Sequence, residues 1–228
     1  MTTAQPEGAR LVTIDGPAAS GKTSVSREVA RRLGWRWVST GAFYRGLAYV
    51  ARQLHADLSQ EDAVVKVAES TEWEVRLHPE RTLVFLNDED VTDEIYREEM
   101  GEYASQISQY PKVRASLLEA QRRCHKGGDT GLVAEGRDCG TVVFPNAPVK
   151  VYLEAASGSR AERRALEQGA SVEETKASQA RRDRQDSTRK TAPLQVPKEA
   201  HRVDTSNLSL EEVVDLVESL IRKDLKIS

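Results

Sequence analysis

Cysteine is scarce in this sequence, and so are aromatic residues and long apolar runs. Among 228 residues there are two cysteines, Cys124 and Cys139, and they form no C-x-x-C pair, which excludes the usual zinc and redox motifs. No apolar run approaches the roughly 20 residues that cross a bilayer. The opening residues, MTTAQPEGAR, contain no apolar segment typical of a signal peptide. We therefore expect a cytoplasmic protein with reduced cysteines and no membrane partner.

Charge of either sign is not in large excess. The chain has 33 basic and 36 acidic residues, a formal net charge of -3, which argues against a protein that coats nucleic acid. Hydrophobic residues make up 39% and charged residues 30%, as in a folded globular protein. The length fits one large domain, or a core with a smaller appendage. No coiled-coil seam demands a dimer, so we expect a monomer.

Short apolar strands alternate with helices at both ends of the chain. This alternation predicts an α/β fold, with a three-layer core around a parallel sheet. The predicted core helices are 22–33 and a C-terminal helix to about Leu225, opened by a capping box of Ser209 and Glu212. The predicted core strands are 10–15, 35–38, 132–135, 149–153 and 201–204.

Two excursions interrupt this core, which we assign to residues 1–38 and 128–228. In the first, residues 39–127, two strands and a short third one near Asp90 predict a small antiparallel sheet at about 72–91. The second, about 157–190, consists of two charged helices, 157–168 and 172–184. The helices expected in the first excursion are 41–54, 59–70 (with a capping box of Ser59 and Asp62), 94–107 and 112–124.

The clearest motif is a glycine-rich loop between the first strand and the first helix. Residues 16–23 read GPAASGKT, which fits the phosphate-binding pattern G-x-x-x-x-G-K-[ST] in the position that the pattern requires. Backbone N–H groups and the helix N-terminus supply positive potential for phosphates. Lys22 reaches the transferred phosphoryl group, and the Thr23 hydroxyl can ligate Mg²⁺.

Arginines and carboxylates elsewhere suggest a second phosphate site. Glu135, at the end of a predicted buried strand, can hold Mg²⁺, possibly through water, while Arg137 can grip a phosphate and Asp138 offers an acceptor. The run 181–189 (RRDRQDSTR) carries Arg182 and Arg189, which a mobile lid could close over the phosphates. Arg160 on the preceding helix and Arg45 after the second strand are further candidates.

Two arginine sources around one phosphate loop favour a kinase whose acceptor already carries a phosphate. The loop by itself also suits a nucleotide-hydrolysing switch or a mechanical ATPase. Against a switch, the chain shows no Asn-Lys-x-Asp base motif and no basic excess. The four histidines suggest no nucleophile–base pair, and phosphoryl transfer needs none.

These residues resemble the bacterial cytidylate kinase family, within the P-loop nucleoside monophosphate kinases. The resemblance runs in family order from about residue 10 to 225. It is most specific at 135–145, which reads EGRDCGTVVFP. The other matching segments are 12–22 (VTIDGPAASGK), 39–45 (STGAFYR), 90–95 (DVTDEI), 104–107 (ASQI), 111–114 (PKVR) and 192–194 (APL).

The resemblance implies a P-loop core, a helical lid and an inserted monophosphate-binding domain that carries a three-stranded antiparallel sheet. It also implies the reaction, in which MgATP phosphorylates CMP or dCMP to CDP or dCDP. A related kinase for UMP, AMP or shikimate should share the loop but lack the 137–145 run and the inserted sheet. A regulatory P-loop protein that hydrolyses nucleotide is the other alternative.

By position, the resemblance also implies site residues. Catalytic roles fall to Lys22, Arg137, Asp138 and Arg182, and Mg²⁺ contacts to Thr23 and Glu135. Contacts on the cytosine side fall to Ser105, Arg114 and Asp138, and contacts to the acceptor phosphate to Arg45, Arg137 and Arg189. Thr40, Tyr44, Arg182 and Asp186 complete the acceptor site, while ATP is bound by Gly16, Pro17, Ala18, Ala19, Ser20, Gly21, Lys22, Thr23, Ser24 and Arg160.

Overall fold

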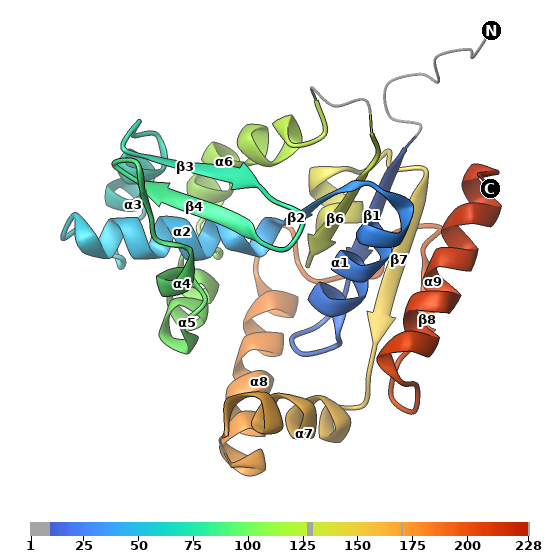
Figure 1. The fold of residues 1–228 in the computed structure, drawn as a ribbon. Coiled ribbons are helices and arrows are strands. Elements are labelled where there is room, and N and C mark those ends of the chain that lie inside the picture. Colours follow the sequence, from blue (N-terminus) through green and yellow to red (C-terminus); the bar gives the residue numbers. More distant parts are fainter. Residues whose placement is uncertain (1–9, 127–129, 170, 228) are drawn as a thin grey trace, which may run out of the picture.

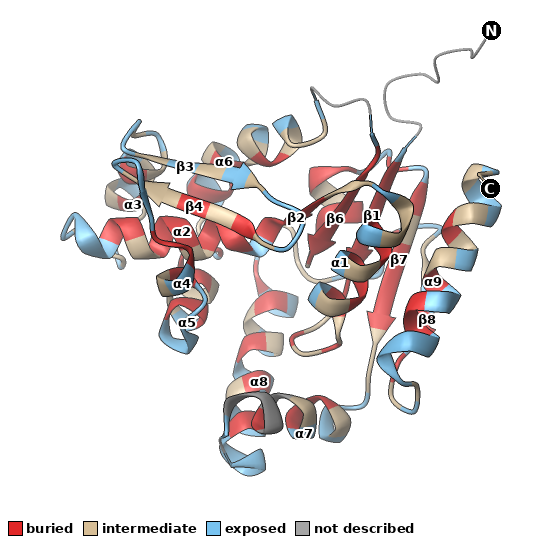
Figure 2. Cartoon of the chain, in the orientation of Figure 1, coloured by how far each residue is buried: buried red, intermediate tan, exposed pale blue. Residues whose placement is uncertain are grey.

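A five-stranded parallel sheet forms the centre of the molecule (Figure 1). The structure is a computed structural model that describes residues 10–126, 130–169 and 171–227. The strand order is β2-β6-β1-β7-β8, and every neighbouring pair is parallel. The central strands are buried on both faces, which explains their continuous apolar runs (Figure 2). The strands are β1 (Leu11–Asp15), β2 (Arg36–Ser39), β6 (Leu132–Gly136), β7 (Val149–Glu154) and β8 (His201–Asp204).

Helices cover both faces of this sheet and complete three layers. On one face, Val29 of α1 and Val217 of α9 pack against Ile14 of β1. On the other face, Leu47 of α2 and Leu117 of α6 pack with the strands. The predicted three-layer α/β core is therefore confirmed. The helices are α1 (Lys22–Leu33), α2 (Thr40–Gln53), α6 (Pro111–Arg123) and α9 (Leu210–Leu225).

The segment between β2 and β6 contains the predicted small sheet. Its three strands pair antiparallel in the order β3-β4-β5, and Val84 of β4 packs on Ala42 of α2 in a small core of their own. The elements of this segment, besides α2 and α6, are α3 (Glu61–Ala68), β3 (Trp73–Leu77), β4 (Thr82–Leu86), β5 (Glu89–Asp90), α4 (Thr92–Ile95) and α5 (Glu98–Ile107).

Two helices follow β7 and lie below the sheet in Figure 1: α7 (Ser157–Gln168) and α8 (Val172–Thr188). The division into a core, an inserted domain at 39–127 and a lid at 157–190 remains our proposal. The expected boundary at 127–128 and the N-terminal residues 1–9 lie outside the described residues. In the part of the chain that the structure describes, no helix is both long and apolar enough to cross a membrane.

Two local expectations were wrong. The expected capping box of Ser59 and Asp62 does not form, because Asp57 accepts the Ser59 N–H at 2.8 Å and the helix begins at Glu61 without a side-chain cap. The expected helix 94–107 is interrupted at Tyr96 and Arg97, giving α4 and α5. In addition, a short π-helix, η1 (Cys139–Val143), occupies a segment to which no element was assigned from the sequence.

The two serines allow a direct test of which helix has a side-chain cap. Ser209 accepts the Glu212 N–H, and the Glu212 carboxylate accepts the Ser209 N–H, so the second predicted box is confirmed. We expect Ser209→Ala to lower the free energy of unfolding by about 1 kcal/mol. Ser59→Ala is the matched control and should change it by less than about 0.5 kcal/mol. Urea titrations measure both, and equal losses would contradict the cap assignment.

Candidate active site

The phosphate loop connects β1 to α1 in a conformation that its glycines permit. Gly16 has a φ of 155°, and a Cβ there would lie 2.3 Å from the Leu153 carbonyl oxygen. Gly21, with a φ of 87°, directly precedes the helix. The loop closes on itself, since Lys22 Nζ donates to the Pro17 carbonyl at 2.7 Å. This is a cradle of backbone N–H groups at a helix N-terminus, which suits phosphate.

Lys22 is buried at the floor of the site. Burial, together with the nearby charge of Arg137, lowers the pKa of Lys22 to about 7, against the opposing effect of Glu135. A phosphate beside this amine would favour its charged form and raise its pKa again. The protonation of Lys22 should therefore depend on whether a phosphate is bound.

Oxygen ligands suited to Mg²⁺ lie next to the loop. Thr23 Oγ1, at the start of α1, lies 3.3 Å from Glu135 Oε1, at the end of β6. Because β6 pairs with β1 in parallel register, its carboxyl end lies beside the loop. Mg²⁺ is bound in proteins by few carboxylates and keeps waters and substrate phosphates as its other ligands. One hydroxyl and one carboxylate fit that pattern.

The turn after β6 is held by a carboxylate that the sequence analysis did not select. Asp15, at the end of β1, accepts the backbone N–H groups of Cys139 and Gly140 at 2.8 and 2.7 Å. Burial raises the pKa of Asp15 to about 6, although these two hydrogen bonds oppose the shift. Gly136 lies close to α2, where a Cβ would approach Thr40 Oγ1 to 2.2 Å. These contacts fix the start of η1 and the direction of the residues before it.

A chain of ion pairs joins α6, the turn after β6 and the end of α8; we call this the acceptor side of the site. Arg114 of α6 pairs with Asp138 of the turn after β6. Arg189, just after α8, lies 3.7 Å from Asp138 and 3.6 Å from Asp186. Arg137 Nε donates to Asp186 Oδ2 at 2.9 Å. Three segments far apart in the sequence are thus joined by alternating charges.

These residues line one cavity of about 480 Å³ that also includes the phosphate loop. Its cationic side chains are Lys22, Arg45, Arg114, Arg137, Arg182 and Arg189, and its carboxylates are Glu98, Glu135, Asp138 and Asp186. The other sequence-predicted residues that line it are Ala18, Ala19, Thr23, Thr40, Tyr44 and Ser105. Outside its lining lie Gly16, Pro17, Ser20, Gly21, Ser24 and Arg160. The structure therefore brings most of the candidates together, while their roles in binding stay predictions.

The helices α7 and α8 contact both ends of this cavity. Arg160 of α7 donates to the Ala18 carbonyl at 3.0 Å and to Asp183 at 2.6 Å, and Asp183 also accepts the Ala18 N–H at 3.3 Å. At the other end, Arg182 of α8 pairs with Glu98 of α5. Two carboxylates thus contact groups that could bind phosphate: a loop amide and an arginine.

Sequence reasoning missed Asp15, Glu98 and Asp183. Asp15 had a signal, because it is a charged residue at the end of an otherwise apolar strand. Asp183 lies within the arginine-rich run that was examined for its cations. Glu98 had no signal in the sequence, since its partner Arg182 is 84 residues away.

The fold and the site define the class of this protein. A parallel α/β sheet with a G-x-x-x-x-G-K-T loop between β1 and α1 makes it a P-loop protein. The family model for cytidylate kinase matches residues 12–223. The chain belongs to the cytidylate kinase family.

Individual relatives agree with this assignment. The chain is 56% identical over 215 residues to a cytidylate kinase of Bdellovibrio bacteriovorus, covering 94% of this chain and 99% of that protein. It is 41% identical over 217 residues to a cytidylate kinase of a Geobacillus species, covering 93% and 96%. A solved structure of an uncharacterized protein from Eubacterium ventriosum shares the fold, with a TM-score of 0.50, 8% identity and coverage of 93% and 98%.

The anchoring role of Asp15 can be tested by comparing substitutions of Asp15 and of Thr13. Asp15→Ala leaves two buried backbone N–H groups without acceptors, so we expect the free energy of unfolding to fall by about 2–4 kcal/mol. Thr13 lies in the same strand, and its buried Oγ1 has no hydrogen-bond partner among the described residues. Thr13→Val should therefore change stability by less than about 0.5 kcal/mol. Denaturant titration compares the two, and an Asp15→Ala protein as stable as Thr13→Val would exclude the anchor.

Proposed function

We propose that the protein transfers the γ-phosphoryl group of ATP to CMP or dCMP in its 480 Å³ cavity. The observation that carries this proposal is that one cavity joins Lys22 and Thr23 of the phosphate loop to the arginines of α2, α6 and α8. A hydrolytic switch needs only the loop. Membership of the cytidylate kinase family supports the same reaction.

The donor end has the groups that hold a triphosphate. The loop amides and Lys22 would bind its phosphates, and Arg160, next to Ala18, lies where a lid cation can reach them. Thr23 and Glu135 would hold Mg²⁺, which supplies further neutralisation of phosphate charge when bound. Phosphoryl transfer requires positioning and charge stabilisation more than covalent chemistry, and fixed cations in a closed site provide both.

The acceptor end has buried donors that await a partner. Arg114 Nε and Arg189 Nη2 are buried and have no hydrogen-bond partner among the described residues. Leaving such donors unpaired is costly, so an anionic ligand with several oxygens fits them. Burial and the neighbouring Arg114 also lower the pKa of Arg189, against the opposing effect of Asp138 and Asp186.

The base would lie beside Asp138, with Ser105 and Arg114 alongside. Cytosine presents an exocyclic amino group where uracil presents a carbonyl oxygen, and a carboxylate accepts from the former and repels the latter. Ser105 currently donates to Gln185 at 2.8 Å, a second side chain from α8 that reaches the acceptor end. We also propose that the protein acts as a monomer and that it is located in the cytoplasm, where ATP is available.

A panel of acceptors tests the reaction. The protein is incubated with MgATP and, separately, CMP, dCMP, UMP, AMP and shikimate, and ADP release is followed. We expect CMP and dCMP to exceed UMP by about tenfold or more in kcat/KM, since one such contact provides roughly 1–3 kcal/mol of discrimination. ADP release without any acceptor, at the same rate as with CMP, would instead support the hydrolytic alternative.

Lys22 gives a second prediction, which follows from its lowered pKa. At pH 8 the amine is mostly neutral in the free protein, so binding of ATP should take up close to one proton; at pH 6 it should take up almost none. Calorimetry in buffers of different ionisation enthalpy measures this uptake. Lys22→Ala should lose both the uptake and the phosphoryl transfer while remaining folded. Wild-type turnover in that variant would overturn the role of the loop.

A further prediction concerns Asp138 and the choice of base. Asp138→Asn is preferable to truncation, because Asn keeps a side-chain oxygen that can accept a hydrogen bond from buried Arg114. We expect the CMP/UMP ratio of kcat/KM to fall by about tenfold, because the amide no longer discriminates in favour of the cytosine amino group. Glu98→Gln, another carboxylate-to-amide change in the same cavity, should leave the ratio unchanged. Steady-state kinetics with both acceptors decide, and an unchanged ratio in Asp138→Asn would assign Asp138 to orienting arginines alone.

A further inference from the structure

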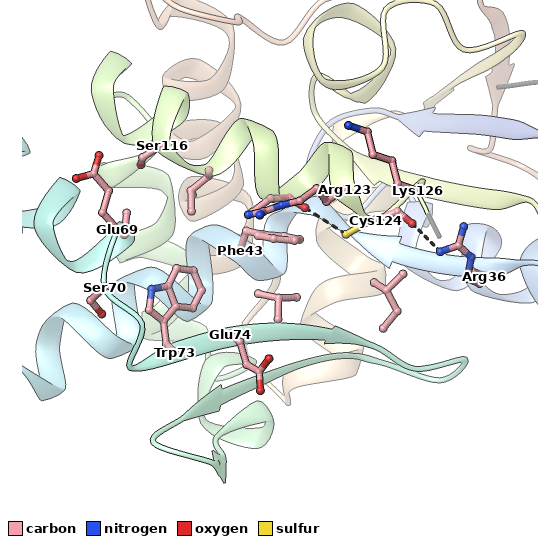
Figure 3. A pocket seen from close by; sticks show the side chains of 15 residues that line it. Arg36, Phe43, Glu69, Ser70, Trp73, Glu74, Ser116, Arg123, Cys124 and Lys126 are labelled. Atoms are coloured by element: carbon pink, nitrogen blue, oxygen red, sulfur yellow. Dashed lines mark hydrogen bonds between the residues drawn. The ribbon is translucent and has the colours of Figure 1, made fainter. Parts of the chain in front are cut away.

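A second and larger cavity, of about 750 Å³, lies apart from the candidate active site (Figure 3). Its walls come from α6, from strand β3 and from the end of α3. The helix α2 separates the two cavities, because Phe43 lines this one while Tyr44 and Arg45 line the other. None of the sequence-predicted site residues contributes to it.

The floor of this cavity is apolar and aromatic. Phe43 and Leu117 are buried beneath it, and Trp73, Val75 and Leu77 project from alternate positions of β3. Trp73 is fixed by a hydrogen bond from its indole N–H to the Val67 carbonyl at 3.0 Å. A volume of several hundred Å³ with such a lining is typical of sites for small organic ligands.

Positive charge gathers at one end of this floor. Arg36, Arg123 and Lys126 line the cavity, and in the described part of the chain none of the three pairs with a carboxylate. Arg36 is held by hydrogen bonds to the carbonyls of Cys124 and His125, at 2.9 and 3.0 Å, and its buried Nε has no hydrogen-bond partner among the described residues. Glu69 and Glu74 also line the cavity, and Glu74 pairs with Arg76. Among the described residues the three cations therefore have no carboxylate partner, and they favour an anion.

The other residues of the lining indicate how such an anion would be oriented in the cavity. In Figure 3, Arg36 and Lys126 lie at one end of the view, whereas Glu69 and Ser70 lie at the other. Burial raises the pKa of the Cys124 thiol to about 11, so the cation end carries no thiolate. The anionic group of a ligand would therefore face Arg36 and Lys126, with its apolar body over Phe43.

We propose that this cavity is a second ligand site, which takes an organic anion with a flat apolar body and one acidic group. The apolar floor provides the binding free energy, and the unmatched cations select for negative charge. The site is separate from the proposed phosphoryl transfer and does not depend on it.

The probe 1-anilinonaphthalene-8-sulfonate has this chemistry, and its fluorescence reports binding. Titrations are made with saturating ADP and CMP present, which together occupy the proposed active site without turnover. We expect one probe to bind per chain. The uncharged N-phenyl-1-naphthylamine should bind at least about tenfold more weakly, a difference of about 1.4 kcal/mol.

Three variants locate the site. The double variant Arg123→Glu with Lys126→Glu changes exposed residues and should weaken probe binding by about tenfold or more. Ala120→Phe should block binding by filling the cavity. The control Lys198→Glu with Lys223→Glu makes the same charge change at exposed positions outside both cavities and should bind as the wild type does. Circular dichroism confirms folding of each.

Three outcomes would overturn the proposal. Probe binding that occurs without ADP and CMP but is lost in their presence would place the probe in the active site. Equal affinity in the two double variants would remove the role of Arg123 and Lys126. Equal affinity for the charged and uncharged probes would show an apolar surface without selection for an anion.

Discussion

Buried guanidinium groups require carboxylate partners, and this requirement determines which residues meet on the acceptor side of the site. A charge removed from water costs several kcal/mol unless it is paired. Here Arg114, Asp138, Arg189, Asp186 and Arg137 alternate in sign and draw α6, the turn after β6 and the end of α8 to one place. Together with the pair of Arg182 and Glu98 and the hydrogen bond from Ser105 to Gln185, these ion pairs hold α8 beside α5, α6 and the turn after β6.

Protein carboxylates also occupy groups that could bind phosphate. Carboxylates from the protein contact the loop amide of Ala18 and the side chain of Arg182, through Asp183 and Glu98. A carboxylate is a poor copy of a phosphate, with two oxygens instead of three and a smaller charge. Substrates that bring phosphate to these groups would therefore compete with the protein's own acids and change how the lid is held.

Much of the fold could be predicted from the sequence, because its signals are local. The small antiparallel sheet expected at about 72–91 is present as β3, β4 and β5, and Ser209 with Glu212 marked the start of α9. The π-helix had no such signal, since its conformation depends on Asp15, 124 residues from Cys139. The charged partners in the site were beyond local reasoning for the same reason. Residue types and motifs identified the candidates, but only the folded chain shows that Arg114 faces Asp138 and Arg182 faces Glu98.

No loop separates β2 from α2, and this continuity has a mechanical consequence. Strand β2 ends at Ser39 and the helix begins at Thr40, while the Ser39 N–H donates to Thr82 Oγ1 of the small sheet at 2.9 Å. The helix therefore starts directly from the sheet, with Thr40 and Tyr44 near this junction and its later turns buried against α3 and α5. Because no loop lies between β2 and α2, a change in the angle of α2 at the junction would move the cavity-lining residues of its first turns and the small sheet together.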